Sequence, residues 1–263
     1  SNFKENILEN ENIDDPVTIA DLKVNDIIIN KINEKYEVVD WEILSEENVK
    51  STNTNCDTNN DWLWILDPLD GTKDFIQGTG NYAIHLALNY KKKPYIGIVL
   101  IPEKDELWIS NGDKVWCERR DGSQLKPQIS NTKILQEMIV ATSKNHKNET
   151  LENLLYKANF KDIFVMGSIG CKIASILRGQ SNIYISLSLP GSSSPKDWDF
   201  AAPEAILKGA GGAITNLENE DLSYGQKDFK HEGIIVASSN KSTHEDICLQ
   251  IKEIIQKYKI YTL

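Results

Sequence analysis

The chain has 263 residues, of which 40% are hydrophobic and 26% charged, and its formal net charge is −10. This length can bury a large core, as one domain or as two joined halves. The acidic balance argues against a nucleic-acid polymer as partner, because such a partner needs a basic surface, and no stretch is apolar enough to span a membrane.

The chain opens with a polar segment, residues 1–15, and a helix is predicted after Pro16. The helix rests on an apolar stripe of Leu22, Val24, Ile27, Ile28 and Ile32. Asp21 lies at its start, either as a first-turn acid that favours the helix dipole or as a catalytic carboxylate. A short strand over 41–44 then ends in the acids that include Glu46, which read as metal ligands or as exposed loop acids. Residues 48–61 are polar and predicted to form a loop.

The most informative stretch is Trp62–Phe75, where five apolar residues run into Asp67. They predict a buried strand that stops at Pro68, since proline cannot donate to a sheet ladder. Asp67 and Asp70 follow one another at a spacing of three residues, and two crowded carboxylates of this kind suit Mg²⁺. If a helix starts after Gly71, the Gly71 and Thr72 amides can hold a phosphate. The alternative is a turn in which both acids only cap backbone amides.

Short strand-like runs over 83–118, separated by turn signals, predict an antiparallel meander. Beyond a soft boundary near residue 130, strands and helices alternate, which indicates an α/β half. We therefore expect two halves, an α+β half over 1–130 with most of the metal ligands and an α/β half over 131–263 with Asp199 and substrate contacts. Four widely scattered cysteines show no zinc pattern, so free thiols in the cytoplasm are expected. Because the sequence begins at Ser1, a removed targeting segment stays open as an alternative.

In the second half, Gly167–Lys172 lies between a predicted strand and a predicted helix. The segment could seat a phosphate with Lys172 as a point charge, or it could be a plain turn. His146 lies in a polar loop, where a lone histidine is usually a surface residue. Asp199 is predicted as a cap or first-turn acid of a helix whose first turn also holds Pro203.

The order of these motifs resembles the inositol monophosphatase-like superfamily, which comprises Mg²⁺-dependent, lithium-sensitive phosphatases. The resemblance runs from about Pro16 to Ser238, and it rests on the acids already named together with Asp-Pro-Leu-Asp-Gly-Thr and Trp198-Asp199-x-Ala-Ala. The ending Lys73-Asp74-Phe75 is most similar to the 3′(2′),5′-bisphosphate nucleotidases. The resemblance to the superfamily implies a layered αβαβα sandwich, which is an α/β (α+β) fold with the site in the cleft between the halves.

The resemblance also implies roles for individual residues. One Mg²⁺ would be held by Glu46, Asp67 and the Leu69 carbonyl, and a second by Asp67, Asp70 and Asp199, with a third ion left open. Asp21 would orient Thr72, and with Glu46 this pair would make up the catalytic residues that activate a metal-bound water. The implied substrate contacts are Gly71, Thr72, His146, Ser168, Lys172 and Asp199.

The implied reaction is hydrolysis of the 3′-phosphate of adenosine 3′,5′-bisphosphate to AMP and phosphate, without a phosphoenzyme. Fold does not fix substrate, so an inositol-1-phosphate or sugar bisphosphate phosphatase is the nearest alternative. A non-catalytic metal- or phosphate-sensing protein is the alternative from another class. The expected partner is a small phosphorylated molecule. Monomer and homodimer both stay open, because only 15 residues precede Pro16, where relatives usually have a helix.

Overall fold

The computed structural model describes residues 18–52, 60–143 and 148–260. Within them the first sheet has seven strands that follow chain order from edge to edge. Only β1 and β2 are parallel, and the remaining neighbours form the predicted antiparallel meander. The strands are β1 (Glu42–Ser45), β2 (Trp62–Asp70), β3 (Ala83–Tyr90), β4 (Lys93–Ile101), β5 (Glu106–Ser110), β6 (Val115–Glu118) and β7 (Gln124–Leu125).

The second sheet has five described strands in the order β11-β12-β10-β8-β9. β8, β9 and β10 are parallel, whereas β12 runs antiparallel to both of its neighbours. The strands are β8 (Ile139–Ser143), β9 (Asp162–Met166), β10 (Ile183–Ser188), β11 (Ala213–Asn216) and β12 (Gly233–Ser238). This mixed sheet with interleaved helices is the predicted α/β arrangement.

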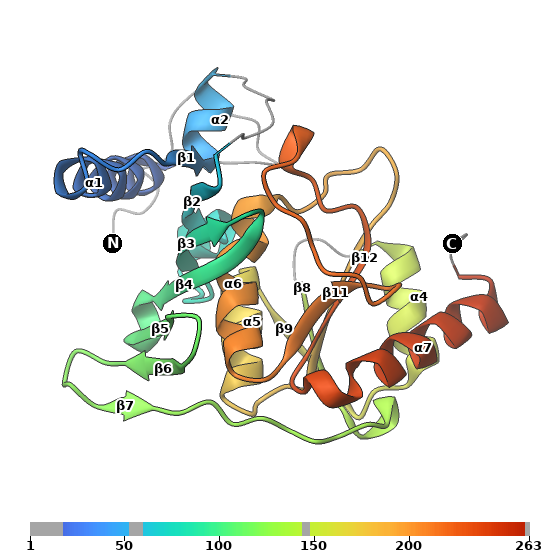
Figure 1. Cartoon of the computed structure of the whole chain (residues 1–263). Coiled ribbons are helices and arrows are strands. Elements are labelled where there is room, and N and C mark those ends of the chain that lie inside the picture. The colour runs from blue at the N-terminus through green and yellow to red at the C-terminus, as the bar shows by residue number, and fades with distance from the viewer. Residues whose placement is uncertain (1–17, 53–59, 144–147, 261–263) are drawn as a thin grey trace.

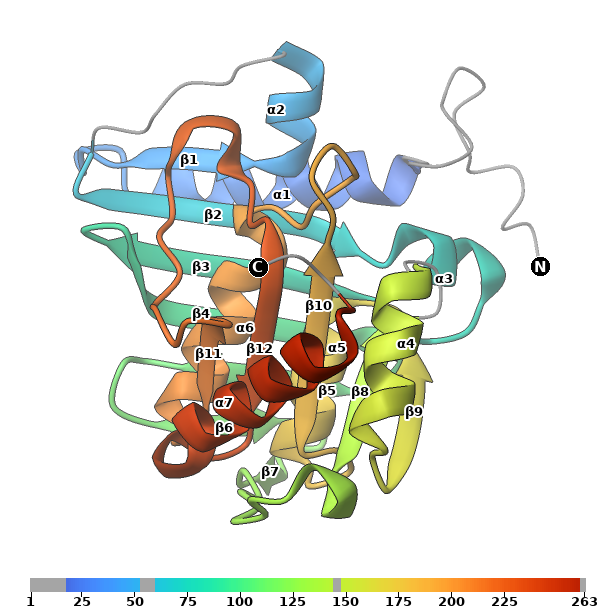
Figure 2. The same cartoon turned by 90° about the vertical axis from the view of Figure 1, so that its right-hand side faces the viewer.

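Helices form three layers around the two sheets (Figure 1). α1 and α2 cover the outer face of the first sheet, α5 and α6 lie between the sheets, and α4 and α7 cover the far face of the second (Figure 2). The helices are α1 (Ile19–Lys35), α2 (Glu46–Thr52), α3 (Thr72–Gln77), α4 (Glu149–Ala158), α5 (Ile169–Leu177), α6 (Asp197–Gly209) and α7 (Lys241–Tyr258). The layered αβαβα fold class is confirmed. No helix in the described ranges is long and apolar enough to cross a bilayer.

The middle layer is the most buried part of the chain, and small residues allow it to pack closely. Every residue of α5 is buried. On β4, a Cβ placed on Gly97 would come within 2.5 Å of the Ala205 Cβ of α6. Glycine and alanine at this crossing allow α6 to lie close against β4.

The sequence predicted that β2 stops at Pro68, but the strand continues to Asp70. Its register against β3 shifts between Asp67, which pairs with His85, and Asp70, which pairs with Ala83. Pro68 therefore falls in an irregular stretch of the ladder, where no strand N–H is required. The bulge keeps both aspartates on one strand while changing the direction of their side chains.

Three other local predictions were wrong. Residues 48–52 belong to α2 and not to a loop, because the helix starts at Glu46. α6 starts at Asp197, which puts Pro203 inside the helix, and its many buried side chains offset the missing proline N–H. On α1, Leu22 and Ile27 are exposed, whereas Asp21 faces the protein.

Candidate active site

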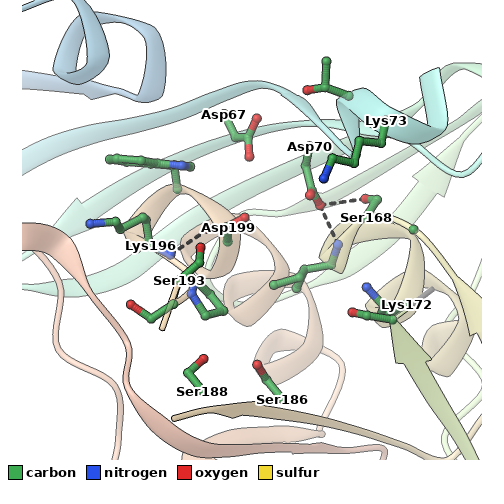
Figure 3. A pocket seen from close by; sticks show the side chains of 18 of the residues that line it. Asp67, Asp70, Lys73, Ser168, Lys172, Ser186, Ser188, Ser193, Lys196 and Asp199 are labelled. Atoms are coloured by element: carbon green, nitrogen blue, oxygen red, sulfur yellow. Dashed lines mark hydrogen bonds between the residues drawn. The ribbon is translucent and has the colours of Figure 1, made fainter. Parts of the chain in front are cut away.

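Three carboxylates converge where β2 meets α6. Asp67 and Asp70 lie on β2 and Asp199 lies in the first turn of α6, and one oxygen from each lies within 4.8 Å of the other two. Figure 3 shows the three side chains facing a common space. Asp67 is only 2% exposed, so this carboxyl group is largely removed from water. The sequence motif and the distant Trp198-Asp199 pair therefore meet in space.

The electrostatics of this cluster favour a bound cation. Burial raises the pKa of Asp67 well above its ordinary value, and the negative charges of Glu46, Asp70 and Asp199 raise it further. Burial and the charge of Asp70 likewise raise the pKa of Asp199. All the donors are hard oxygen atoms, the ligands that Mg²⁺ prefers, so the residues present fit a magnesium site.

Two further predicted ligands line the same cavity, namely Glu46 and Leu69. Glu46 shares a hydrogen bond with the Asp67 carboxyl, and its Oε1 lies 3.0 Å from the Lys50 Nζ. The Leu69 carbonyl accepts a 3.0 Å hydrogen bond from the Thr72 hydroxyl. A carbonyl oxygen has a second lone pair, so this bond leaves Leu69 able to coordinate an ion.

Asp21 lies behind Thr72 and contacts it from α1. Its Oδ1 is 3.3 Å from the Thr72 hydroxyl, and its Oδ2 accepts a 2.8 Å hydrogen bond from the Thr18 amide. Burial raises the pKa of Asp21, although these hydrogen bonds oppose the change. Asp21 therefore both caps α1 and contacts Thr72, so the two alternative readings of its sequence position are compatible.

The N-terminus of α5 binds a carboxylate of the chain itself. The Asp70 Oδ2 accepts hydrogen bonds from the Ser168 hydroxyl at 2.7 Å, the Ile169 amide at 2.5 Å and the Gly170 amide at 3.2 Å. Sequence reasoning proposed this segment for a phosphate and missed its contact with Asp70. The segment fixes one metal-ligand candidate, and substrate contact by Ser168 stays a prediction.

The cavity extends well beyond the carboxylates, with a volume of about 920 Å³. Lys172, only 2% exposed, lies on its wall with Nζ 5.3 Å from the centre of the Tyr184 ring. Burial lowers the pKa of this lysine, whereas the nearby charge of Asp70 raises it. Figure 3 shows Ser186 and Ser188 opposite the acids. Away from Thr72 and Ser168, the cavity is lined by the hydroxyl-bearing residues Ser143, Tyr184, Ser186, Ser188, Ser192, Ser193 and Ser194.

Most of the predicted site residues thus line one cavity, which includes Gly71, Thr72 and Ser168. His146 lies outside the described residues. Sequence reasoning missed Lys196 and the serines of β10, although Lys196 directly precedes the helix that carries Asp199. Its Nζ donates a 2.8 Å hydrogen bond to the Asp228 carbonyl.

The sequence matches the family model of the inositol monophosphatase family over residues 1–256. The chain belongs to this family. It is accordingly a phosphomonoester hydrolase of the Mg²⁺-dependent superfamily that its motifs resemble, as that resemblance predicted.

Comparisons with individual proteins agree with this assignment. A Buchnera aphidicola protein named 3′(2′),5′-bisphosphate nucleotidase CysQ is 31% identical over 209 residues, 80% of this chain and 74% of its own. A solved inositol monophosphate-bound SaIMPase-II is 25% identical with a TM-score of 0.72, over 91% of this chain and 86% of its own. An IMPase/NADP phosphatase solved with Mg²⁺ and phosphate has a TM-score of 0.73 at 21% identity, over 93% and 85% of the two chains.

Proposed function

We propose that the protein hydrolyses the 3′-phosphate of adenosine 3′,5′-bisphosphate to AMP and phosphate. The observation that carries this proposal is the shape and charge of the cavity. Beyond the acidic cluster it continues into a lobe with a buried lysine, Lys172, and several hydroxyls. A second phosphate and a ribose find complementary groups there, whereas an inositol monophosphate has no second anion for the lysine. The name of the Buchnera aphidicola relative supports the same substrate.

The chain's own oxygens would hold two Mg²⁺ ions. The first would bind Glu46, Asp67 and the Leu69 carbonyl, and the second Asp67, Asp70 and Asp199, so that Asp67 serves both. Bound magnesium supplies positive charge beside the scissile phosphate and lowers the pKa of a bound water. The raised pKa of Asp67 without a cation supports this assignment.

The remaining groups would position the reactants. The Gly71 and Thr72 amides, at the start of α3, would donate hydrogen bonds to the phosphate oxygens. The Thr72 hydroxyl, contacted by Asp21, would accept a hydrogen bond from the attacking water. As the water oxygen bonds to phosphorus, the bond to the 3′ oxygen breaks and that oxygen leaves with a proton.

A second candidate is an inositol-1-phosphate phosphatase, because a relative of the same fold is solved with inositol monophosphate bound. Both candidates use the same acidic cluster and differ only in the use of the outer lobe. A non-catalytic sensor is disfavoured, since every matched acid and Thr72 are present. The division near residue 130, the cytoplasmic location and the choice between monomer and homodimer stay predictions.

The test is phosphate release with Mg²⁺ from adenosine 3′,5′-bisphosphate, adenosine 3′-monophosphate and inositol 1-phosphate in parallel. We expect the bisphosphate to have the highest kcat/KM. Lys172→Met should raise its KM by about tenfold or more, the effect of losing a charge-assisted contact, and should change the monophosphate less. Lys31→Met is the matched control, because Lys31 is exposed and pairs only weakly with Glu34 at 3.4 Å. A preference for inositol 1-phosphate would overturn the substrate assignment and keep the metal site.

A further inference from the structure

His85 is a fully buried residue that the proposed chemistry does not use. It lies on β3, directly opposite Asp67 of β2, and its exposed fraction is 0%. Its Nδ1 is 3.3 Å from the Trp198 carbonyl oxygen, and its Nε2 is 3.2 Å from the Asp70 Oδ2. One imidazole therefore touches the strand that carries Asp70 and the helix turn that carries Asp199.

The chemistry of the two contacts is different. A carbonyl oxygen can only accept, so Nδ1 must carry the hydrogen that bonds to Trp198. Nε2 makes no hydrogen bond to the part of the chain that the structure describes, although it lies against Asp70. The ring thus anchors the first turn of α6 on one side and abuts the Asp70 carboxylate on the other.

The packing around the ring leaves it no room to move. A Cβ built on Gly170 of α5 would lie 2.2 Å from the His85 Nε2 and 2.9 Å from the Val99 Cγ1. Such distances are far below van der Waals contact, so the close approach of α5 requires glycine at this position. The same turn of α5 donates its amides to Asp70. His85, α5 and Asp70 are therefore packed as one unit.

We propose that His85 is a positioning residue of the metal site, which holds the Asp199 turn of α6 in place beside Asp70 through its Nδ1 bond to the Trp198 carbonyl. The inference rests on the magnesium site proposed above but not on the identity of the substrate. Partners that orient metal ligands commonly contribute tenfold or more to metal affinity, because a misplaced ligand loses coordination geometry. The role of His85 is therefore visible in Mg²⁺ binding itself.

The experiment is calorimetric titration of Mg²⁺ into metal-free protein without substrate. His85→Asn keeps an amide N–H near the Nδ1 position and should bind Mg²⁺ with nearly the wild-type affinity. His85→Gln places its amide near the Nε2 position, loses the bond to Trp198, and should bind Mg²⁺ about tenfold more weakly. Thermal unfolding of both variants checks that each is folded at the titration temperature.

The matched control is His244→Gln, in an equally buried histidine remote from the acids. His244 lies on α7, and its ring nitrogens contact the Thr215 and Ser238 hydroxyls at 2.8 and 2.7 Å. This variant should lose thermal stability and keep wild-type Mg²⁺ affinity.

The proposal would be overturned if His85→Gln bound Mg²⁺ with wild-type affinity, if His85→Asn bound it as weakly as His85→Gln, or if His244→Gln lost as much Mg²⁺ affinity as His85→Gln. Failure of the substrate assignment would leave these titrations unchanged, because no substrate is present. A wild type that binds no Mg²⁺ would remove the metal site and this inference with it.

Discussion

The molecule buries carboxylates in two ways, and the contrast separates structure from function. Glu106 on β5 is 3% exposed, and it accepts hydrogen bonds from the Trp108 indole at 3.0 Å and the Arg178 guanidinium at 2.6 Å. Asp67 on β2 is equally buried, at 2% exposed, and accepts a hydrogen bond from the Leu69 amide. The neighbouring charges that raise its pKa all belong to other acids. The chain neutralises Glu106 itself, whereas the acidic cluster, in the function proposed here, is neutralised by a bound cation.

The difference also assigns a physical role to each region. Arg178 directly follows α5 and Glu106 lies on β5, so this pair ties the helix layer between the sheets to the first sheet. The acidic cluster lies where β2 meets α6. In the function proposed here, repulsion among its carboxylates opposes folding until a cation binds. A change in the acidic cluster should therefore lower activity and raise the stability of the metal-free protein, whereas a change at Glu106 and Arg178 should lower stability alone.

The largest effect is expected for Asp67→Asn. It removes the ligand shared by both proposed ions, so kcat should fall by about a thousandfold. The same change replaces a carboxyl group that is unfavourable to ionise in the folded protein with a neutral amide, so at neutral pH the metal-free variant should unfold at a higher temperature than metal-free wild type. Phosphate release and thermal unfolding in EDTA measure the two effects. Equal Mg²⁺ dependence of activity in the variant and the wild type would contradict the assignment.

The corresponding experiment on the buried pair of Glu106 and Arg178 is Arg178→Met. Its loss leaves Glu106 buried without its closest cation, and breaking a buried pair in this way typically costs about 3 kcal/mol of unfolding free energy. Denaturant unfolding measures this loss, and Mg²⁺ affinity of the folded variant should stay unchanged. A weakened Mg²⁺ affinity would show that the two clusters are coupled.

A smaller effect is expected for Asp21→Asn. Asp21 contacts the reaction only through Thr72, so kcat should fall by about ten- to a hundredfold, less than for Asp67→Asn. Loss of the charged cap should also cost about 1 kcal/mol of stability. Thr72→Val, which keeps the shape and removes the hydroxyl, should match the kinetic loss without the loss at the cap. An Asp21 variant worse than Asp67→Asn would reverse the ranking.

The smallest and most diagnostic effect is the pH dependence of metal-free stability. The pKa values of Asp67 and Asp199 are raised in the folded protein, so the folded state holds protons that the unfolded state has lost. Without metal, their contribution to stability is fully present below the ordinary carboxyl pKa, about 4, and is lost as the pH rises through the higher folded values. Saturating Mg²⁺ should suppress this loss. Unfolding temperatures in EDTA and in Mg²⁺ across pH 5 to 8 measure the difference, and parallel curves would contradict it.

Part of this site could be predicted from the sequence because its chemistry is local. Asp67, Asp70 and Thr72 lie within six residues, and their spacing predicted either a cation site or a turn in which both acids cap backbone amides. Asp199 and Glu46 joined them only through the family resemblance, since no local pattern brings residues so distant in sequence together. The meander and the alternating second half were also readable, because hydrophobic periodicity and turn residues determine them.

The remaining features depend on tertiary packing. The continuation of β2 past Pro68 depends on a bulge opposite β3, which proline statistics alone do not reveal. The hold of α5 on Asp70 and the contacts of His85 need three elements to meet. A buried histidine on an apolar strand carries no signal in one sequence that separates it from a core residue.

The central claim is that the acidic cluster is a Mg²⁺ site that exchanges protons for metal. The most direct test is calorimetric titration of Mg²⁺ into metal-free protein near pH 6, in two buffers that differ in ionisation enthalpy. The account predicts saturable binding with net proton release in wild type, and loss of both in Asp67→Asn. No saturable binding, or binding unaltered in Asp67→Asn, would contradict it.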